Sequence, residues 1–163
     1  MKALLSRAVA LLGRVNRPLA LAGRNFAALL LAVMLAMALA QIISRGLFNH
    51  SLDWAEELAR VALVWSVLLV APYAYRKGAH VAIVSFAEAL PPRLLALTSL
   101  LINLLIVWIL ARLFTESFAF WKRGLEITAT TLDIKMAWIY AIVPAAFGLL
   151  ILVGIELLGR LLL

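Results

Sequence analysis

The residues best suited to chemistry are the charged side chains between Asp53 and Arg60, in the segment DWAEELAR. Asp53 lies three residues before Glu56, a spacing typical of a helix start in which the first residue caps the helix. Arg60 follows Glu56 by one helical turn and can pair with it. Glu56 and Glu57 point in different directions from such a turn, which argues against paired catalytic carboxylates. The segment favours a structural or partner-docking surface formed by Trp54, Glu56, Glu57 and Arg60.

A second polar segment, RKGAH, covers Arg76 to His80. Gly78 can end a helix in the left-handed conformation, and the two cations suit the negative end of a helix dipole. His80 titrates near neutral pH when unperturbed. Beside two cations, however, it is more typical of a loop residue that forms hydrogen bonds than of a ligand or proton relay. We expect Arg76, Lys77, Gly78 and His80 to form a cytoplasmic anchor.

Patterns of known catalytic or metal chemistry are missing from the sequence. There are no cysteines and only 2 histidines, which excludes thiol catalysis and argues against a histidine-built metal site. A nucleophile elbow, a metal-binding HExxH and a phosphate-binding glycine loop are also absent. We therefore expect no enzyme, no catalytic residue, no cofactor and no bound metal.

The elements that must position these residues are membrane-spanning helices. The chain is 66% apolar and only 14% charged, whereas a soluble domain carries about 25% charged residues. Apolar stretches approaching the ~20 residues that cross a bilayer place spans near residues 25–46, 57–76, 94–115 and 136–157. The predicted fold is an all-α integral membrane protein, with a single four-helix transmembrane domain over residues 19–163.

Basic residues predict the orientation of these spans, because positively charged loops resist translocation. One side of the membrane receives Lys2, Arg7, Arg14, Arg17, Arg24, Arg76, Lys77, Arg93 and Arg160, against Arg45, Arg60, Arg112, Lys122, Arg123 and Lys135 on the other. Six of the 8 acids lie on the second side, so the whole formal charge of +7 belongs to the first. We assign the first side, which holds both ends of the chain, to the cytoplasm. In a chain this apolar the basic charge indicates membrane orientation, not a nucleic acid partner.

Residues 1–18 are expected to form a separate amphipathic helix. At 100° per residue, one face is apolar and comprises Met1, Leu4, Leu5, Ala8, Leu11, Leu12 and Val15, and the other carries Lys2, Ser6, Arg7, Arg14 and Arg17. Such a helix lies in the cytoplasmic interface with its cations near anionic lipid headgroups. Pro18 then marks a turn into the first span.

Alanines recur at every fourth position of the first span, at Ala28, Ala32, Ala36 and Ala40. Small residues let membrane helices approach closely, and packing is what drives their association in lipid. We interpret this alanine ridge as a helix-packing face, either within the chain or with a partner.

The spans carry few polar residues, and none of them has an ionisable group near its middle. An ion-driven carrier needs such groups at the midplane, or paired broken helices. Pro72 and Pro144 lie toward helix ends and do not indicate such a pair. The sequence therefore favours a scaffold over an autonomous transporter.

Together these motifs resemble the small membrane subunit of tripartite ATP-independent periplasmic (TRAP) transporters, the DctQ- or SiaQ-like family. The resemblance covers about residues 25–158 and rests on RGLF at Arg45, WAEELAR at Trp54, Trp65, RKGAHV at Arg76, and Pro91, followed by Pro144 and Gly148 in the last span. Two departures are the absence of an acid shortly after His80 and Lys135 where a proline often precedes the last helix.

The resemblance implies an accessory subunit of a bacterial inner-membrane complex. Its partners would be a large multi-span transport subunit of the DctM or SiaM type, a periplasmic substrate-binding protein and membrane lipids. The complex would take up an organic acid, such as a sialic acid or a dicarboxylate, with sodium. Trp54, Glu56, Glu57 and Arg60 match the family's outer motif, and Arg76, Gly78 and His80 match its inner turn.

Two other classes of function remain open from the residues alone. The first is a small homo-oligomeric transporter or channel, which would transport by itself in liposomes. The second is an integral membrane enzyme or assembly factor, which would act without a membrane partner.

Overall fold

The computed structural model describes residues 2–50, 52–78, 91–129, 131 and 134–162. Five helices lie in these ranges: α1 (Lys2–Phe48), α2 (Asp53–Arg76), α4 (Pro92–Arg123), α5 (Met136–Tyr140) and α6 (Ile142–Leu161). The predicted all-α fold is confirmed, and four helical segments are long and apolar enough to cross a membrane: Ser6–Phe48, Asp53–Arg76, Leu94–Arg123 and Met136–Leu161.

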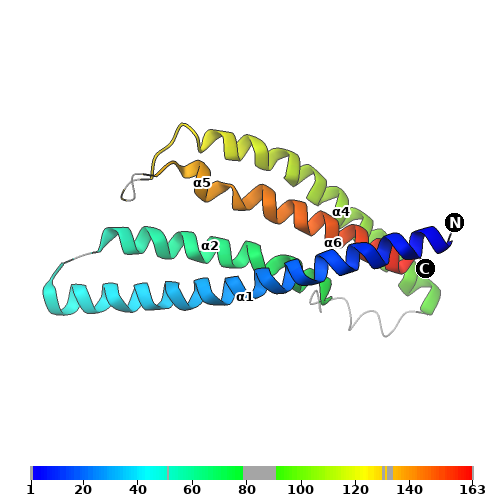
Figure 1. Cartoon of the computed structure of the whole chain (residues 1–163), viewed down its shortest axis with the longest axis horizontal. Helices are drawn as coiled ribbons and strands as arrows, with labels where there is room; N and C mark the ends of the chain where they lie inside the picture. Colours follow the sequence, from blue (N-terminus) through cyan, green and yellow to red (C-terminus); the bar gives the residue numbers. More distant parts are fainter. Residues whose placement is uncertain (1, 51, 79–90, 130, 132–133, 163) are drawn as a thin grey trace.

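The helices form two antiparallel pairs that lie against each other (Figure 1). α1 and α2 make a long hairpin, and α4 packs against α6. The pairs meet through α6, which contacts both α1 and α2. Both termini lie at the same end of the molecule (Figure 1), as an even number of spans requires.

Helix α1 is one continuous helix of 47 residues, and Pro18 lies inside it. The predicted turn at Pro18 is therefore wrong. A proline in a helix loses the hydrogen bond to the carbonyl four residues earlier, but the turns before Pro18 are held against α6 through Val9, Gly13 and Asn16. At 1.5 Å per residue α1 is about 70 Å long, more than twice the ~30 Å core of a bilayer. Residues 2–24 therefore extend the helix beyond the first span, and they do not form a separate element.

The prolines of the other spans differ in their effect on the helix. Pro72 is buried inside α2 without ending it. The last span is divided at Ala141, between α5 and α6. Pro144 cannot donate to the carbonyl of Tyr140, which explains the break at this position. The bounds of the spans also differ from the prediction: α4 ends at Arg123, whereas the third span was expected to end near residue 115.

Close helix packing depends on glycines. A Cβ at Gly23 of α1 would lie 2.7 Å from the carbonyl oxygen of Leu69 in α2, and one at Gly154 of α6 would lie 2.6 Å from Val107 of α4. Beside Gly154, Tyr75 and Val153 form the centre of the small apolar core with Leu110. The absence of a side chain at these glycines therefore sets the distance between neighbouring helices.

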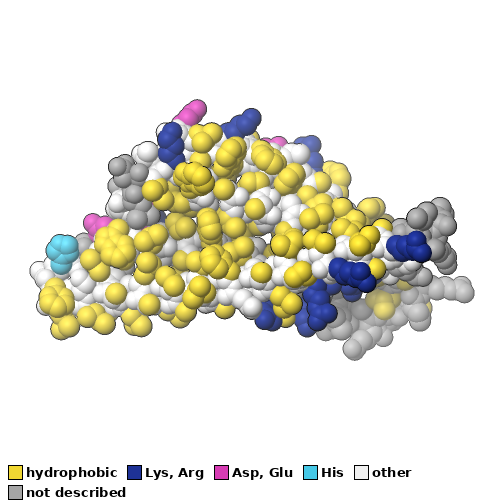
Figure 2. Space-filling model, viewed as in Figure 1, with side chains coloured by type: hydrophobic (Ala, Val, Ile, Leu, Met, Phe, Trp, Pro, Cys, Tyr) yellow, Lys and Arg dark blue, Asp and Glu magenta, His cyan; other side chains and the backbone are white. Residues whose placement is uncertain are grey.

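Apolar side chains cover the broad visible face of the molecule, and Lys and Arg gather at the end that holds the termini (Figure 2). Exposed large apolar residues occur on all the long helices, for example Leu35 at 58% and Trp108 at 62% exposure. A surface of this kind requires lipid or protein around it.

Candidate functional site

The most elaborate polar site is a buried cluster at the end that holds the termini. Glu156 of α6 is fully buried at 0% exposure. Its Oε1 accepts from Arg76 Nη2 at 2.9 Å and from Arg160 Nη2 at 2.5 Å. Its Oε2 accepts from Asn16 Nδ2 at 2.9 Å, and Asn16 also donates to the Leu152 carbonyl at 3.1 Å. One carboxylate thereby joins α1, α2 and α6.

This inner cluster is arranged so that the buried charge is paired and hydrogen-bonded, as a carboxylate away from water requires. The side chain of Arg76 is 20% exposed and that of Arg160 is 52% exposed. Gly13 of α1 makes room for the carboxylate, because a Cβ there would lie 3.1 Å from Glu156 Oε1. The cluster fixes where α1 crosses the ends of α2 and α6.

Sequence reasoning missed this cluster. Arg76 was predicted as an anchor at the membrane surface, but its guanidinium lies against Glu156. Asn16 was left out of the amphipathic pattern, and it is fully buried. A signal did exist, since Glu156 is an acid in an apolar helix on the side of the membrane that carries the basic excess.

The predicted cytoplasmic anchor stays a prediction, although the conformation expected at Gly78 is confirmed. Gly78 has φ +68°, the left-handed conformation expected at a helix end. Lys77 Nζ lies 6.0 Å from the ring centre of Tyr73, and Arg24 packs over the same ring at 4.9 Å and donates to its hydroxyl. His80 lies outside the described residues.

The predicted outer surface lies at the start of α2. Glu56 pairs with Arg60 across one helical turn at 3.2 Å, as expected, and both side chains are exposed. Glu57 points elsewhere and accepts from the backbone N–H of Thr131 at 2.9 Å and from its hydroxyl. Trp54 is 46% exposed. The four residues therefore lie within about the first two turns of α2, with Glu57 tied to the loop that follows α4.

The predicted capping role of Asp53 is wrong. α2 begins at Asp53 itself, and the cap position is held by Leu52, which makes no side-chain capping bond. Asp53 and Glu56 both lie in the first turn, where their charges still favour the positive end of the helix dipole.

The outer loop between α4 and α5 is held by backbone hydrogen bonds. Ala129 N–H donates to Ile134 at 2.8 Å and Met136 N–H donates to Ile127 at 2.9 Å. Gly124 lies so close to Ala137 that a Cβ would come within 2.7 Å of its nitrogen. On the α2 side, Trp65 Nε1 donates to the Ile139 carbonyl at 3.0 Å. This loop therefore supports the outer turn of α2 as a fixed surface.

The alanine ridge does not pack within the chain. Ala28, Ala32, Ala36 and Ala40 are all exposed. α1 instead meets its neighbours through Ala20 and Ala27, which are 1% and 2% exposed, and through Gly23. The ridge remains free to face another molecule.

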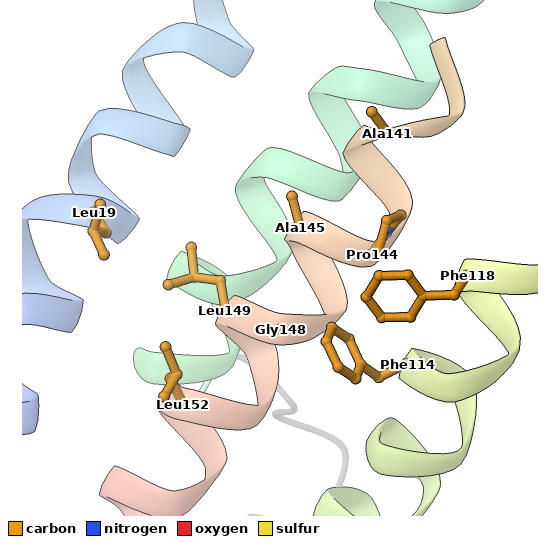
Figure 3. Close-up of a pocket in the computed structure, with 9 residues that line it drawn as sticks. All are labelled: Leu19, Phe114, Phe118, Ala141, Pro144, Ala145, Gly148, Leu149 and Leu152. Carbon is orange, nitrogen blue, oxygen red and sulfur yellow. The ribbon is translucent and has the colours of Figure 1, made fainter. Parts of the chain in front are cut away.

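A wide apolar groove of about 650 Å³ lies between α1, α4 and α6. In Figure 3, Phe114 and Phe118 of α4 point toward Gly148 and Pro144 of α6, and Leu19 of α1 lies on the opposite side. All of its lining residues are apolar: Leu19, Phe114, Phe118, Ala141, Pro144, Ala145, Gly148, Leu149 and Leu152. A site for an organic anion requires polar groups that fix the ligand, so this groove is suited to lipid chains or to another helix.

Within the described ranges, no cluster of three or more His, Cys, Asp or Glu side chains could hold a metal ion. The polar sites at both ends instead join helices to one another. Together these features define a helical membrane component whose polar side chains join one helix to another.

Comparison with known proteins identifies the family. The model of the family "Tripartite ATP-independent periplasmic transporters, DctQ component" matches residues 34–163. The chain therefore belongs to the DctQ family, which confirms the resemblance in the sequence motifs. It is a multi-pass protein of the bacterial inner membrane.

Two known proteins of sialic acid TRAP transporters are similar to this chain in sequence. The sialic acid TRAP transporter small permease protein SiaQ of Vibrio cholerae is 26% identical over 115 residues, which are 71% of this chain and 66% of that protein. The sialic acid TRAP transporter permease protein SiaT of Haemophilus influenzae is 32% identical over 77 residues, 47% of this chain but 12% of that protein. This chain thus spans just under two thirds of the first relative and a small part of the second.

Proposed function

We propose that this chain is the small accessory subunit of a TRAP transporter, and that it holds a large multi-span transport subunit in the membrane. Membership of the DctQ family carries the proposal. In this role the chain is not an enzyme and binds no substrate alone. Specificity for the organic acid resides in the large subunit and the periplasmic binding protein.

The relative SiaT supports the association with a larger permease. The stretch similar to this chain is 12% of SiaT, so it is part of a chain several times as long. A sequence that occurs inside a larger permease of one organism is expected to act beside such a permease in another.

The surface of the chain also supports a scaffold. The alanine ridge and the groove beside Phe114 are apolar, exposed and without charged residues. Packing between helices is the main attraction available in lipid. We assign the alanine ridge to the contact with the large subunit, and the turn of Trp54, Glu56, Glu57 and Arg60 to the docking of the binding protein.

Uptake by reconstituted liposomes tests this function. The large subunit, the binding protein and a sodium gradient are supplied with or without this chain, and uptake of sialic acid and of a dicarboxylate is measured. We expect that one of the two substrates is taken up, and that this uptake requires all three proteins.

Three results would contradict the proposal. Full uptake without this chain would exclude a required subunit. Uptake by this chain alone would favour the homo-oligomeric transporter. An enzymatic turnover of lipid or peptide by the purified chain would favour the remaining alternative.

A further inference from the structure

A groove lined by four arginines lies beside the inner cluster. Arg14 and Arg17 come from α1, Arg76 from the end of α2 and Arg160 from the end of α6. The small side chains of Ala10 and Gly13 in α1 leave a space of about 360 Å³ among these arginines. This volume is within the range of small-ligand sites, roughly 300–1,000 Å³. We call this the inner arginine groove.

The charge of the groove is not balanced by the protein around it. Glu156 is the one carboxylate that contacts these arginines among the described residues, and it pairs with Arg76 and Arg160. Arg14 and Arg17 are exposed, and in the described ranges neither has a hydrogen-bonded or ion-paired partner. Four arginines against one carboxylate leave the groove with a net charge of +3. Planar guanidinium groups bind phosphate oxygens with paired hydrogen bonds.

The position of the groove favours a phosphate that belongs to a lipid. It lies at the end of the bundle that holds both termini, where the basic excess places the cytoplasmic surface. Anionic lipids are concentrated in this leaflet and attract basic residues at its surface.

A second, apolar groove lies further along α1, toward the membrane interior. It has a volume of about 250 Å³ and is lined by Leu31 of α1 and by Leu63, Val67 and Val70 of α2, with Arg24 at one end. At 100° per residue, Arg14, Arg17, Arg24 and Leu31 fall within an arc of about 100° on α1. Leu31 lies about 21 Å along the helix from Arg17, close to the ~20 Å of half a bilayer with its headgroup region. One phospholipid can therefore reach both grooves.

We propose that the inner arginine groove binds the phosphate of an anionic phospholipid, whose acyl chain follows the apolar groove between α1 and α2. The lipid joins α1 to the ends of α2 and α6. Because this site belongs to the chain alone, it does not depend on the proposed transport role.

Native mass spectrometry of the full chain in detergent tests the site, with equal amounts of phosphatidylglycerol and phosphatidylcholine. We expect a single bound phosphatidylglycerol in preference to phosphatidylcholine. Arg14→Gln and Arg17→Gln should each weaken its retention about fivefold, the effect of one basic residue near an anionic surface. The matched control is Arg7→Gln, which removes another exposed cation of α1 that does not line the groove. Circular dichroism checks that each variant folds.

Three results would overturn the proposal. If Arg7→Gln weakened the retention of phosphatidylglycerol as much as Arg14→Gln and Arg17→Gln do, the lipid would be attracted by the general charge of α1 and not by a defined site. Displacement of the lipid by millimolar inorganic phosphate, with no preference between the two lipids, would assign the groove to a free anion. Failure of the chain to retain either lipid, with Arg14 and Arg17 protected from arginine modification only in complex with the large subunit, would assign it to an acidic protein surface.

Discussion

At the scale of residues, the buried carboxylate of Glu156 has the largest structural consequence. It accepts hydrogen bonds from three side chains on three helices. Without the carboxylate, the fully buried Asn16 would lose a hydrogen-bond partner and the largely buried Arg76 would lose its counter-charge. The cost of removing the carboxylate follows from the donors that it leaves behind.

Glu156→Gln should lower the stability of the chain. The amide keeps the volume but leaves Arg76, which is 20% exposed, without its charge partner. Loss of one member of a fully buried pair costs about 3–5 kcal/mol, and the partial exposure of Arg76 and Arg160 reduces our expectation to roughly 2 kcal/mol. Thermal unfolding in detergent measures the change. Glu116→Gln, at an exposed position of α4, is the control, and equal stability of the two variants would refute a structural role for the cluster.

At the scale of elements, the spans were predictable and their contacts were not. Hydropathy located all four spans because it depends only on local composition. The continuity of α1 through Pro18 was missed, since Val9, Gly13 and Asn16 are held by α6, far away in sequence. The capping role of Asp53 failed for a smaller reason, a shift of the helix start by one residue.

Gly23→Ala should loosen the hairpin of α1 and α2. Alanine favours a helix over glycine by about 1 kcal/mol, but its Cβ would meet the Leu69 carbonyl at 2.7 Å. We therefore expect a net loss of stability by thermal unfolding. The same substitution at Gly46, where nothing lies within 4 Å, should be neutral or stabilising. A stabilising effect at both positions would contradict the observed packing.

The alanine ridge makes a separate prediction about the partner. Ala32→Leu with Ala36→Leu adds bulk to an exposed face, so the chain should fold normally but co-purify less with the large subunit. Ala111→Leu adds similar bulk at an exposed position of α4 and should have no effect. The opposite pattern would place the partner against α4.

At the scale of the whole molecule, charge asymmetry predicts which end faces the cytoplasm. The chain has no cysteine, so single cysteines can report the side directly. Gly46→Cys should react with a membrane-impermeant maleimide on intact spheroplasts, and Leu162→Cys should react only after lysis. The reverse labelling would invert the assigned orientation.

The molecule as a whole presents lipid-facing apolar surfaces and polar joints between helices, with an outer turn supported by the loop at Thr131. The groove beside Phe114 has no polar lining residue. These properties suit a chain that holds another membrane protein, in agreement with its family.

The most direct test of this role is affinity purification of the tagged full chain from its native membranes in mild detergent, with mass spectrometry of what accompanies it. We predict a single large multi-span permease of the TRAP class in a fixed ratio to this chain. Recovery of the chain alone, or only as copies of itself, under conditions that preserve other membrane complexes would contradict the account.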